Sequence, residues 1–140
     1  MLARTSSTYD CGDTNKGKVV WEYLKDQGVK HLDVLMASHA HKDHVGRCSF
    51  LLQKIIVKET YDNGSPSETG TYKKFKTLAR QKARYQSITA DTLVHNLEVF
   101  VAYDTKGKLS EADRSLMVKL IHDQVSFLFT GDWVEPNKGT

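Results

Sequence analysis

The chain has 140 residues, of which 39% are apolar, and a formal net charge of +3. This is enough for one small globular domain over residues 1–140 and too little for two ordinary domains. No apolar run approaches the roughly 18 residues of a membrane-spanning helix, and the segment before Asp10 lacks the apolar core of a secretory leader. We therefore expect no membrane segment in the chain; the compartment stays open, with the cytoplasm as the default assignment.

The first half of the chain alternates between helical and strand-like patterns. Apolar residues recur at helical spacing before Gly28, a residue that favours the end of a helix. The pattern predicts, in chain order, a helix over 16–27, a strand over 32–37, a helix over 45–54, a strand over 55–61 ended by a turn at 62–66, and a helix over 71–85.

The second half is dominated by strand-like segments. They are expected over 92–95, 98–103, 115–122 and 126–130, with a loop at 104–108 and a tight hairpin link at Asp123-Gln124. Strand hairpins with flanking helices indicate an α/β fold, a sandwich in which sheets pack beneath helices.

The most specific motif lies in the loop after the strand predicted over 32–37. His39, His41, Asp43 and His44 follow one another as H-x-H-x-D-H. Zinc and similar ions bind neutral imidazole nitrogen and carboxylate oxygen, and residues two apart on an extended segment face the same way, so His39 and His41 can hold one ion together. Asp43 and His44 then lie past the turn, placed for a second ion or for the nucleophilic water. The alternative is a polar loop whose histidines are only solvated or cap a helix.

Two carboxylates at strand tips can complete such a site. Asp132 follows the apolar strand predicted over 126–130, where Gly131-Asp132 alone would be an ordinary turn signal. Beside a histidine cluster, Asp132 becomes a candidate metal ligand, because two ions held close together need a bridging carboxylate. Asp10 suits another role, which is to accept the free N–H of a ligand histidine.

A basic stretch has two open interpretations. It contains Lys73, Lys74, Lys76 and Arg80, interleaved with aromatic residues. This composition would suit a groove that follows a nucleic-acid backbone, so these four residues are candidate nucleic-acid contacts. The more ordinary interpretation is a solvated helix face.

Cys11 and Cys48 are the only cysteines. Two thiols define no disulfide framework, and neither belongs to a C-x-x-C pair, so we interpret both first as small buried residues. Cys11 also lies close to the predicted site loop, where a thiol could approach a metal.

Together these motifs resemble those of the metallo-β-lactamase fold superfamily. Its pattern is a strand-end Asp-x-Gly, then S-H-x-H-x-D-H-x-G, then a strand ending in T-G-D. The matching segments here are Asp10-Cys11-Gly12, Ser38 to Gly46 and Thr130-Gly131-Asp132. Within the superfamily, the sequence is most similar to the nuclease-like domain of the bacterial competence (DNA-uptake) protein ComEC and its stand-alone relatives. The phrases that carry this similarity lie at 20–28, 32–39, 114–118 and 126–132.

The resemblance implies a metal-dependent hydrolase that acts on phosphodiester bonds, with nucleic acid as the substrate class. One or two ions, zinc or alternatively manganese, would be bound by His39, His41, Asp43, His44 and Asp132, and Asp43 would also help to orient the water. The alternative is a non-catalytic metal-binding or interaction module that keeps the ligands.

The resemblance also implies a shortened domain. The αββα sandwich would be incomplete, reduced to its first half plus the T-G-D strand, because superfamily members add strands before the first motif and a second half after the last. They also supply a histidine just before the T-G-D strand; residues 111–115 contain none here, and the strand contexts of His95 and His122 do not match that position. Uncovered sheet edges would then favour association with a second copy of the chain.

Overall fold

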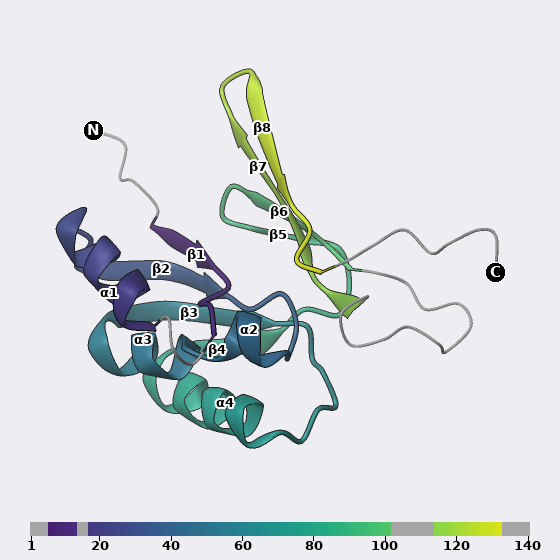
Figure 1. The fold of residues 1–140 in the computed structure, drawn as a ribbon. Helices are drawn as coiled ribbons and strands as arrows, with labels where there is room; N and C mark the ends of the chain where they lie inside the picture. The colour runs from purple at the N-terminus through teal and green to yellow at the C-terminus, as the bar shows by residue number, and fades with distance from the viewer. Residues whose placement is uncertain (1–5, 14–16, 102–113, 133–140) are drawn as a thin grey trace.

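The computed structural model describes residues 6–13, 17–101 and 114–132 (Figure 1). These residues form two four-stranded sheets, with helices covering one face of the first sheet and the second sheet lying against its other face (Figure 1). The prediction of an α/β sandwich is thereby confirmed. Among the helices in these ranges, none has the length and apolar character needed to cross a membrane.

The first sheet is parallel, and its strands lie side by side in chain order. They are β1 (Ser7–Tyr9), β2 (His31–Met36), β3 (Ile56–Asp62) and β4 (Arg84–Ser87). In the register of the sheet, Leu35 of β2 lies between Thr8 of β1 and Thr60 of β3. The carboxyl ends of all four strands therefore meet at one edge, where sites collect in parallel sheets.

Helices fill the connections between these strands. They are α1 (Gly17–Asp26), α2 (Lys42–Val45), α3 (Cys48–Lys54) and α4 (Gly70–Lys82). Crossovers between parallel neighbours share one hand, which places the helices on the same face of the sheet. α4 begins where the Thr69 side chain accepts a hydrogen bond from the Tyr72 backbone N–H (3.3 Å), and it buries Tyr72, Phe75 and Ala79 at helical spacing.

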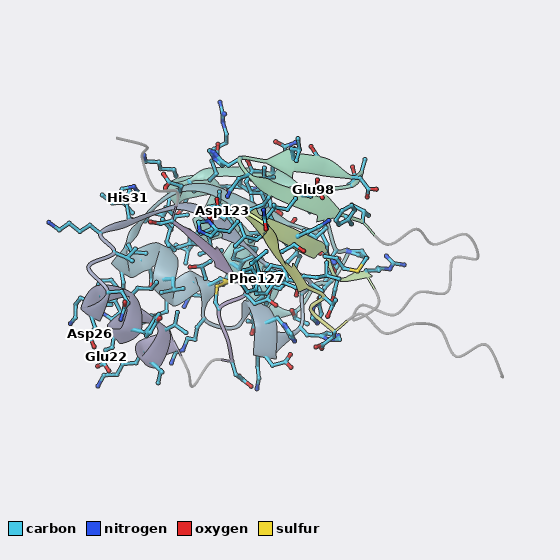
Figure 2. The ribbon with its side chains drawn as sticks, turned by 90° about the horizontal axis from the view of Figure 1, so that it is seen from above. Glu22, Asp26, His31, Glu98, Asp123 and Phe127 are labelled. Atoms are coloured by element: carbon cyan, nitrogen blue, oxygen red, sulfur yellow. A yellow bond between two sulfur atoms is a disulfide. The ribbon has the colours of Figure 1, made fainter. Side chains whose placement is uncertain are left out.

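The second sheet is antiparallel. Its strands, again in chain order, are β5 (Thr92–Val94), β6 (Leu97–Phe100), β7 (Met117–His122) and β8 (Val125–Phe129). The Asp123-Gln124 hairpin link is confirmed, with Asp123 in the left-handed region at φ 54°. Seen from above (Figure 2), Glu98 lies on this sheet, while Glu22 and Asp26 project from α1 on the opposite side of the first sheet.

β8 is an edge strand and is exposed along its whole length. Its Phe127, labelled in Figure 2, is 50% exposed, and Leu128 is 61% exposed. This is an uncovered apolar edge of the kind through which the sequence predicts association with a second copy. Association through it stays a prediction.

β2 lies between two apolar cores because its side chains alternate between the faces of the first sheet. Leu35 packs toward the helices, together with Leu51 and Phe75. Val34 and Met36 pack toward the second sheet. The loop that follows β2 is consequently fixed by packing on both sides.

The structure differs from the predicted elements at two places. The helix predicted over 45–54 is divided into α2 and α3, separated by Gly46 and Arg47. The helix predicted over 71–85 ends at Lys82, because Ala83 is extended and the chain continues as β4, a strand that the sequence did not predict. The loop predicted at 104–108 and the end of the strand predicted over 98–103 lie outside the described residues.

Candidate metal centre

Four of the five predicted metal ligands meet at the carboxyl edge of the first sheet. His39 directly follows β2, Asp43 and His44 lie on α2, and Asp132 lies just beyond β8. Each of the four offers a ligand atom, and these atoms all lie within 4.8 Å of one another. The cluster thus joins three residues of the helical layer to one residue from the second sheet.

His39 is fully buried, and its two ring nitrogens have different surroundings. Nδ1 lies 2.8 Å from the Ser38 hydroxyl and 3.0 Å from the Ser115 hydroxyl. Nε2 has no hydrogen-bond partner and lies 3.4 Å from Oδ2 of Asp132. Burial, together with the neighbouring histidines, lowers the pKa of His39 below its usual value, which favours the neutral ring that a metal requires.

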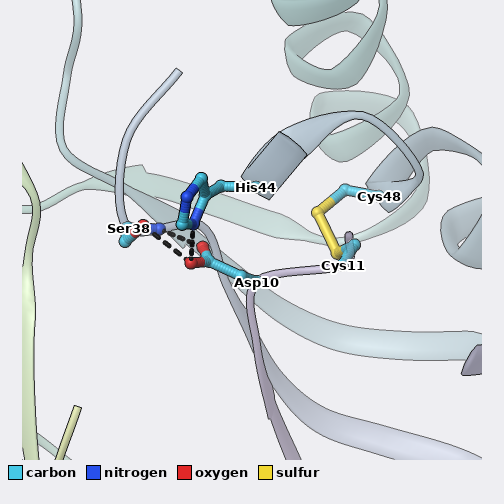
Figure 3. The surroundings of a disulfide bond; sticks show 5 residues. All are labelled: Asp10, Cys11, Ser38, His44 and Cys48. Carbon is cyan, nitrogen blue, oxygen red and sulfur yellow. Dashed lines mark hydrogen bonds and ion pairs between the residues drawn. A yellow bond between two sulfur atoms is a disulfide. The ribbon is translucent and has the colours of Figure 1, made fainter. Parts of the chain in front are cut away.

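His44 is oriented by Asp10. Its Nδ1 lies 2.6 Å from Oδ2 of Asp10, so that the Nδ1–H donates to the carboxylate (Figure 3). Nε2 consequently faces the cluster, 3.0 Å from Oδ1 of Asp132 and 3.5 Å from Oδ2 of Asp43. Burial alone would lower the pKa of His44, but the hydrogen bond to Asp10 and the nearby carboxylates outweigh burial and raise it.

Asp10 is itself held firmly. Its Oδ1 accepts the backbone N–H of Ser38 at 2.6 Å, and its Oδ2 accepts the Ser38 hydroxyl at 2.8 Å (Figure 3). The backbone of Asp10 has φ 61°, in the left-handed region, which Asp tolerates better than most residues. Asp10 therefore links the turn after β1 to the loop after β2.

Asp132 reaches the cluster because the residue before it is glycine. Gly131 has φ 59°, and a Cβ at this position would lie 2.8 Å from Cβ of Ser115 and 3.0 Å from Cβ of Ser38. Only a residue without a side chain allows this approach of the β8 end to the first sheet. The Gly-Asp pair is thus more than an ordinary turn.

His41 lies outside the group of four. It is exposed, and its ring contacts that of His39 edge-on, with 4.7 Å between the centroids. Asp43 belongs to the group, yet its side chain is 61% exposed. The four converging residues could hold one ion, and a second ion at His41 would need further ligands.

The donor set fits a divalent metal ion. A buried imidazole nitrogen without a hydrogen bond is costly unless it has another partner, and His39 Nε2 is such an atom, directed at a carboxylate. His44, with a carboxylate behind it at Asp10, shows the arrangement that fixes the tautomer of metal-binding histidines. Two imidazole nitrogens and two carboxylates suit zinc, and manganese less closely.

Cys11 and Cys48 are both fully buried, as expected, but they are joined in a disulfide (Figure 3). Their interpretation as two separate small residues was wrong in this respect. The pairing depends on a contact between segments 37 residues apart, which sequence spacing does not reveal. Bonded to each other, the sulfur atoms are not thiol ligands for a metal.

Sequence reasoning missed two further groups near this edge. One is Ser115, whose hydroxyl supports His39 and accepts the Asp132 backbone N–H at 3.2 Å. The other is the buried carboxylate of Asp62 at the end of β3, which accepts the hydroxyls of Tyr72 (2.6 Å) and Tyr85. The only sequence signal for Asp62 was its place in a turn, where the residue is normally exposed.

The basic residues predicted as nucleic-acid contacts lie on α4. Lys73, Lys74 and Arg80 are exposed, and Lys76 is half-buried. Lys76 lies over the Tyr72 ring at 4.6 Å, and Arg80 lies over the Tyr85 ring at 5.3 Å. The aromatic residues of this stretch therefore face the protein and are not a stacking surface for bases.

No protein-family model matches the chain, and no curated protein sequence matches it. Solved structures do. A candidate metallo-β-lactamase from Thermotoga maritima superposes with a TM-score of 0.62 at 10% identity, covering 92% of this chain and 64% of that one. The metallo-β-lactamase fold protein YhfI from Bacillus subtilis gives a TM-score of 0.59 at 13% identity, covering 93% and 52%. The mono-zinc form of the metallo-β-lactamase FIM-1 from Pseudomonas aeruginosa gives 0.50 at 18% identity, covering 84% and 49%.

The chain spans about half to two thirds of the length of these three structures. Identities this low carry the fold and say nothing about the substrate. The His/Asp cluster of this chain lies at the carboxyl edge of the first sheet. The chain therefore has the metallo-β-lactamase fold, with a cluster of side chains that could hold a metal ion.

Proposed function

We propose that the protein is a metal-dependent hydrolase. The proposed ion is zinc, bound by His39, Asp43, His44 and Asp132. The observation that carries this proposal is the buried Nε2 of His39, which has no hydrogen bond and is directed at Asp132. Buried polar atoms are rarely left without a partner, and a bound metal ion would be the partner of this one. The fold adds weight, since metallo-β-lactamase structures include a zinc form.

The protein side chains divide the chemistry among themselves. When bound, a divalent ion lowers the pKa of a water towards neutrality and stabilises charge that develops on the reacting oxygens. His39 and His44 present Nε2 because hydroxyls and Asp10, respectively, occupy their Nδ1 atoms. Asp43 is the exposed carboxylate of the group, and it is the one placed to accept a proton from the attacking water.

We propose phosphodiesters as the substrate class, supported by cationic groups in a pocket whose lining begins two residues beyond His44. A pocket of about 270 Å³ lies between the start of α3 and the first turn of α4. Its lining includes Arg47 and Lys74, and Arg47 Nε is buried without a hydrogen-bond partner among the described residues. Gly46, two residues beyond the candidate ligand His44, belongs to the same lining. A phosphate group would be stabilised by these two cations.

Metal content tests the first part of the proposal. Purified wild-type protein should hold about one zinc per chain, Asp132→Ala should lose it, and His95→Ala should keep it, because His95 pairs with Glu59 (2.7 Å) outside the centre. His41→Ala separates one ion from two: we expect no change in ion count. Two ions, of which one disappears in His41→Ala, would replace the single site by a dinuclear one.

Turnover separates a hydrolase from a module that only binds metal. The zinc-loaded protein should hydrolyse bis(4-nitrophenyl) phosphate, and Asp43→Asn should lower the rate. A stoichiometric ion without hydrolysis of this substrate, of single-stranded or double-stranded DNA, or of RNA would favour the non-catalytic alternative.

Charge reversal on α4 tests nucleic acid as the substrate. Lys73→Glu with Lys74→Glu should weaken DNA binding and reduce the slope of log K against log salt concentration by about 1.4–1.8, since each lost phosphate contact removes about 0.7–0.9. The matched control is Lys18→Glu with Lys25→Glu on α1, which removes the same charge from another exposed helix. Equal binding and equal slopes in both double variants would refute a nucleic-acid surface on α4.

A further inference from the structure

We propose that the Cys11–Cys48 disulfide is a positioning element of the metal centre, which holds the Asp10–His44 hydrogen bond in place and makes metal affinity depend on the redox state of the two cysteines. The inference rests on the proposed function for its metal readout. It goes beyond that function by assigning a control to the site.

The placement of the two cysteines carries the argument. Cys11 directly follows Asp10, and Cys48 is the first residue of α3, a short distance along the chain from His44 (Figure 3). The disulfide therefore joins the two segments whose side chains meet in the 2.6 Å contact between Asp10 Oδ2 and His44 Nδ1. The covalent bond and this hydrogen bond act between the same pair of segments.

The segment that carries Asp10 is fixed to β2, because the Asp10 N–H donates to the Met36 carbonyl (2.7 Å) and the carboxylate accepts from Ser38; its attachments to the segment of His44 are fewer. It follows β1, a three-residue strand at the edge of the first sheet. Two backbone hydrogen bonds tie it to the segment of His44, from the Cys11 N–H to the His44 carbonyl (2.8 Å) and from the Arg47 N–H to the Gly12 carbonyl (3.3 Å). The left-handed φ of Asp10 is an uncommon conformation that the surroundings must maintain.

Reduction would remove the covalent tie and leave the weaker ones. A dithiol reductant supplies two electrons and two protons, the S–S bond breaks, each cysteine becomes a thiol, and the reductant closes to its own disulfide. Both cysteines are fully buried, so the two products would be neutral thiols in an apolar core and reduction would be slow. Asp10 would stay bonded to Met36 and Ser38, whereas the segment of His44 would spend part of its time away from it, and Nδ1 of His44 would lose its fixed acceptor.

The expected effect is a loss of metal affinity without a loss of the site. Changes to groups that orient a metal-binding histidine usually cost 10–100-fold in affinity. Since the Asp10 carboxylate is still present after reduction, we expect the lower end, about tenfold.

The experiment compares oxidised and dithiothreitol-reduced protein, with removal of the reductant before zinc is added. Zinc affinity is measured by competition with a chromophoric chelator, and the Nδ1–H of His44 is followed by NMR of the metal-free protein. We expect about tenfold weaker zinc binding after reduction, with broadening of the His44 signal. Cys11→Ser with Cys48→Ser should behave as the reduced protein does. Tyr72→Phe, which is expected to lose stability at a distance from the centre, should change neither readout.

Three results would overturn the inference: equal zinc affinity in both redox states, an unchanged His44 signal on reduction, or two free thiols per chain in the air-oxidised protein. Failure of the proposed function is a different result. If neither state binds zinc, the metal centre is refuted, and the His44 signal alone then decides whether the disulfide positions Asp10 against His44. If the double serine variant does not fold, reduced wild-type protein supplies the comparison.

Discussion

Asp10→Asn is the most informative single substitution because it replaces one carboxylate oxygen by an NH₂ group and changes almost no volume. The carboxylate accepts three hydrogen bonds, from the Ser38 N–H (2.6 Å), the Ser38 hydroxyl (2.8 Å) and His44 Nδ1 (2.6 Å). Asn also tolerates the left-handed region in which Asp10 lies, so the backbone should remain as it is. Any effect must then come from the exchange of an oxygen acceptor for an NH₂ donor.

After the exchange, two hydrogen-bond donors face each other: the new amide NH₂ and the Nδ1–H of His44. If the amide oxygen keeps the Ser38 N–H, the amide NH₂ faces His44 Nδ1, which can no longer donate. The ring proton moves to Nε2, the atom that faces the cluster, and the lone pair is lost from the site. A hydrogen bond to a charged group is worth about 1.5–3 kcal/mol. A 10–100-fold loss of metal affinity corresponds to about 1.4–2.7 kcal/mol, so both routes give the same range.

Asp33→Asn is the matched control. Asp33 also accepts a backbone N–H, from Ser6 (2.8 Å), and also lies near a histidine, with 3.6 Å between its Oδ1 and Nε2 of His31. That backbone bond holds the pKa of Asp33 below its usual range, but the residue is remote from the cluster. Zinc affinities from chelator competition should fall only for Asp10→Asn. Equal affinities in the two variants would refute the assignment of Asp10 as the group that orients His44.

Three further predictions concern the framework of the site. Tyr72→Phe should lower the free energy of unfolding, measured with urea, by about 1.5–3 kcal/mol, because it removes a hydrogen bond to a buried carboxylate. The control is Tyr23→Phe at a 63% exposed position, which should change the free energy of unfolding by less than about 0.5 kcal/mol. Burial, with a hydrogen bond to the same carboxylate, raises the pKa of Tyr85 to about 12. The native state thus keeps this proton longer than the unfolded chain, whose tyrosines titrate near 10, so stability present below pH 10 should be lost as the pH rises through 12. Tyr85 should contribute about 1–2 kcal/mol of this pH-dependent stability, after discounting for its partial exposure. Between pH 9 and pH 11.5, urea titrations should show a smaller loss in the free energy of unfolding for Tyr85→Phe than for the wild type. Gly131→Ala should lower both stability and zinc affinity, because the new Cβ would lie 2.8 Å from a serine side chain. The control is Gly28→Ala, which has a similarly unfavourable φ (74°) but no atom within 4 Å of the new Cβ. It should lower stability alone, by about 1–2 kcal/mol.

The parts of the fold that the sequence predicts well are those with a local cause. Alternation and helical spacing are properties of neighbouring residues, and they place β2, α1 and the β7–β8 hairpin within a residue or two. β4 was missed because the aromatic residue Tyr85 continues the helical spacing of α4. Its hydroxyl instead reaches the buried carboxylate of Asp62, a tertiary contact that overrides the local pattern.

In the candidate site, too, the sequence predicts the local features and misses those that depend on contacts between distant segments. The spacing of His39, Asp43 and His44 is local, and the structure brings these three side chains together. Their meeting with Asp132 depends on the close packing of Gly131 against the first sheet, and the disulfide depends on a turn that places Cys11 beside α3. Contacts between segments far apart in the chain leave no periodic signal in one sequence.

The candidate ligands are divided between the two layers of the sandwich, with three on the loop and short helix after β2 and one at the tip of β8. An ion bound by all four residues would connect the two layers, so part of its binding free energy would stabilise the packing of the second sheet against the first. Zinc should accordingly slow amide hydrogen exchange in β7 and β8 far more than in β2 and β3, whose protection comes from the apolar core beneath the helices. Loss of the metal would then first weaken the packing of the second sheet, while the first sheet and its helices would stay folded.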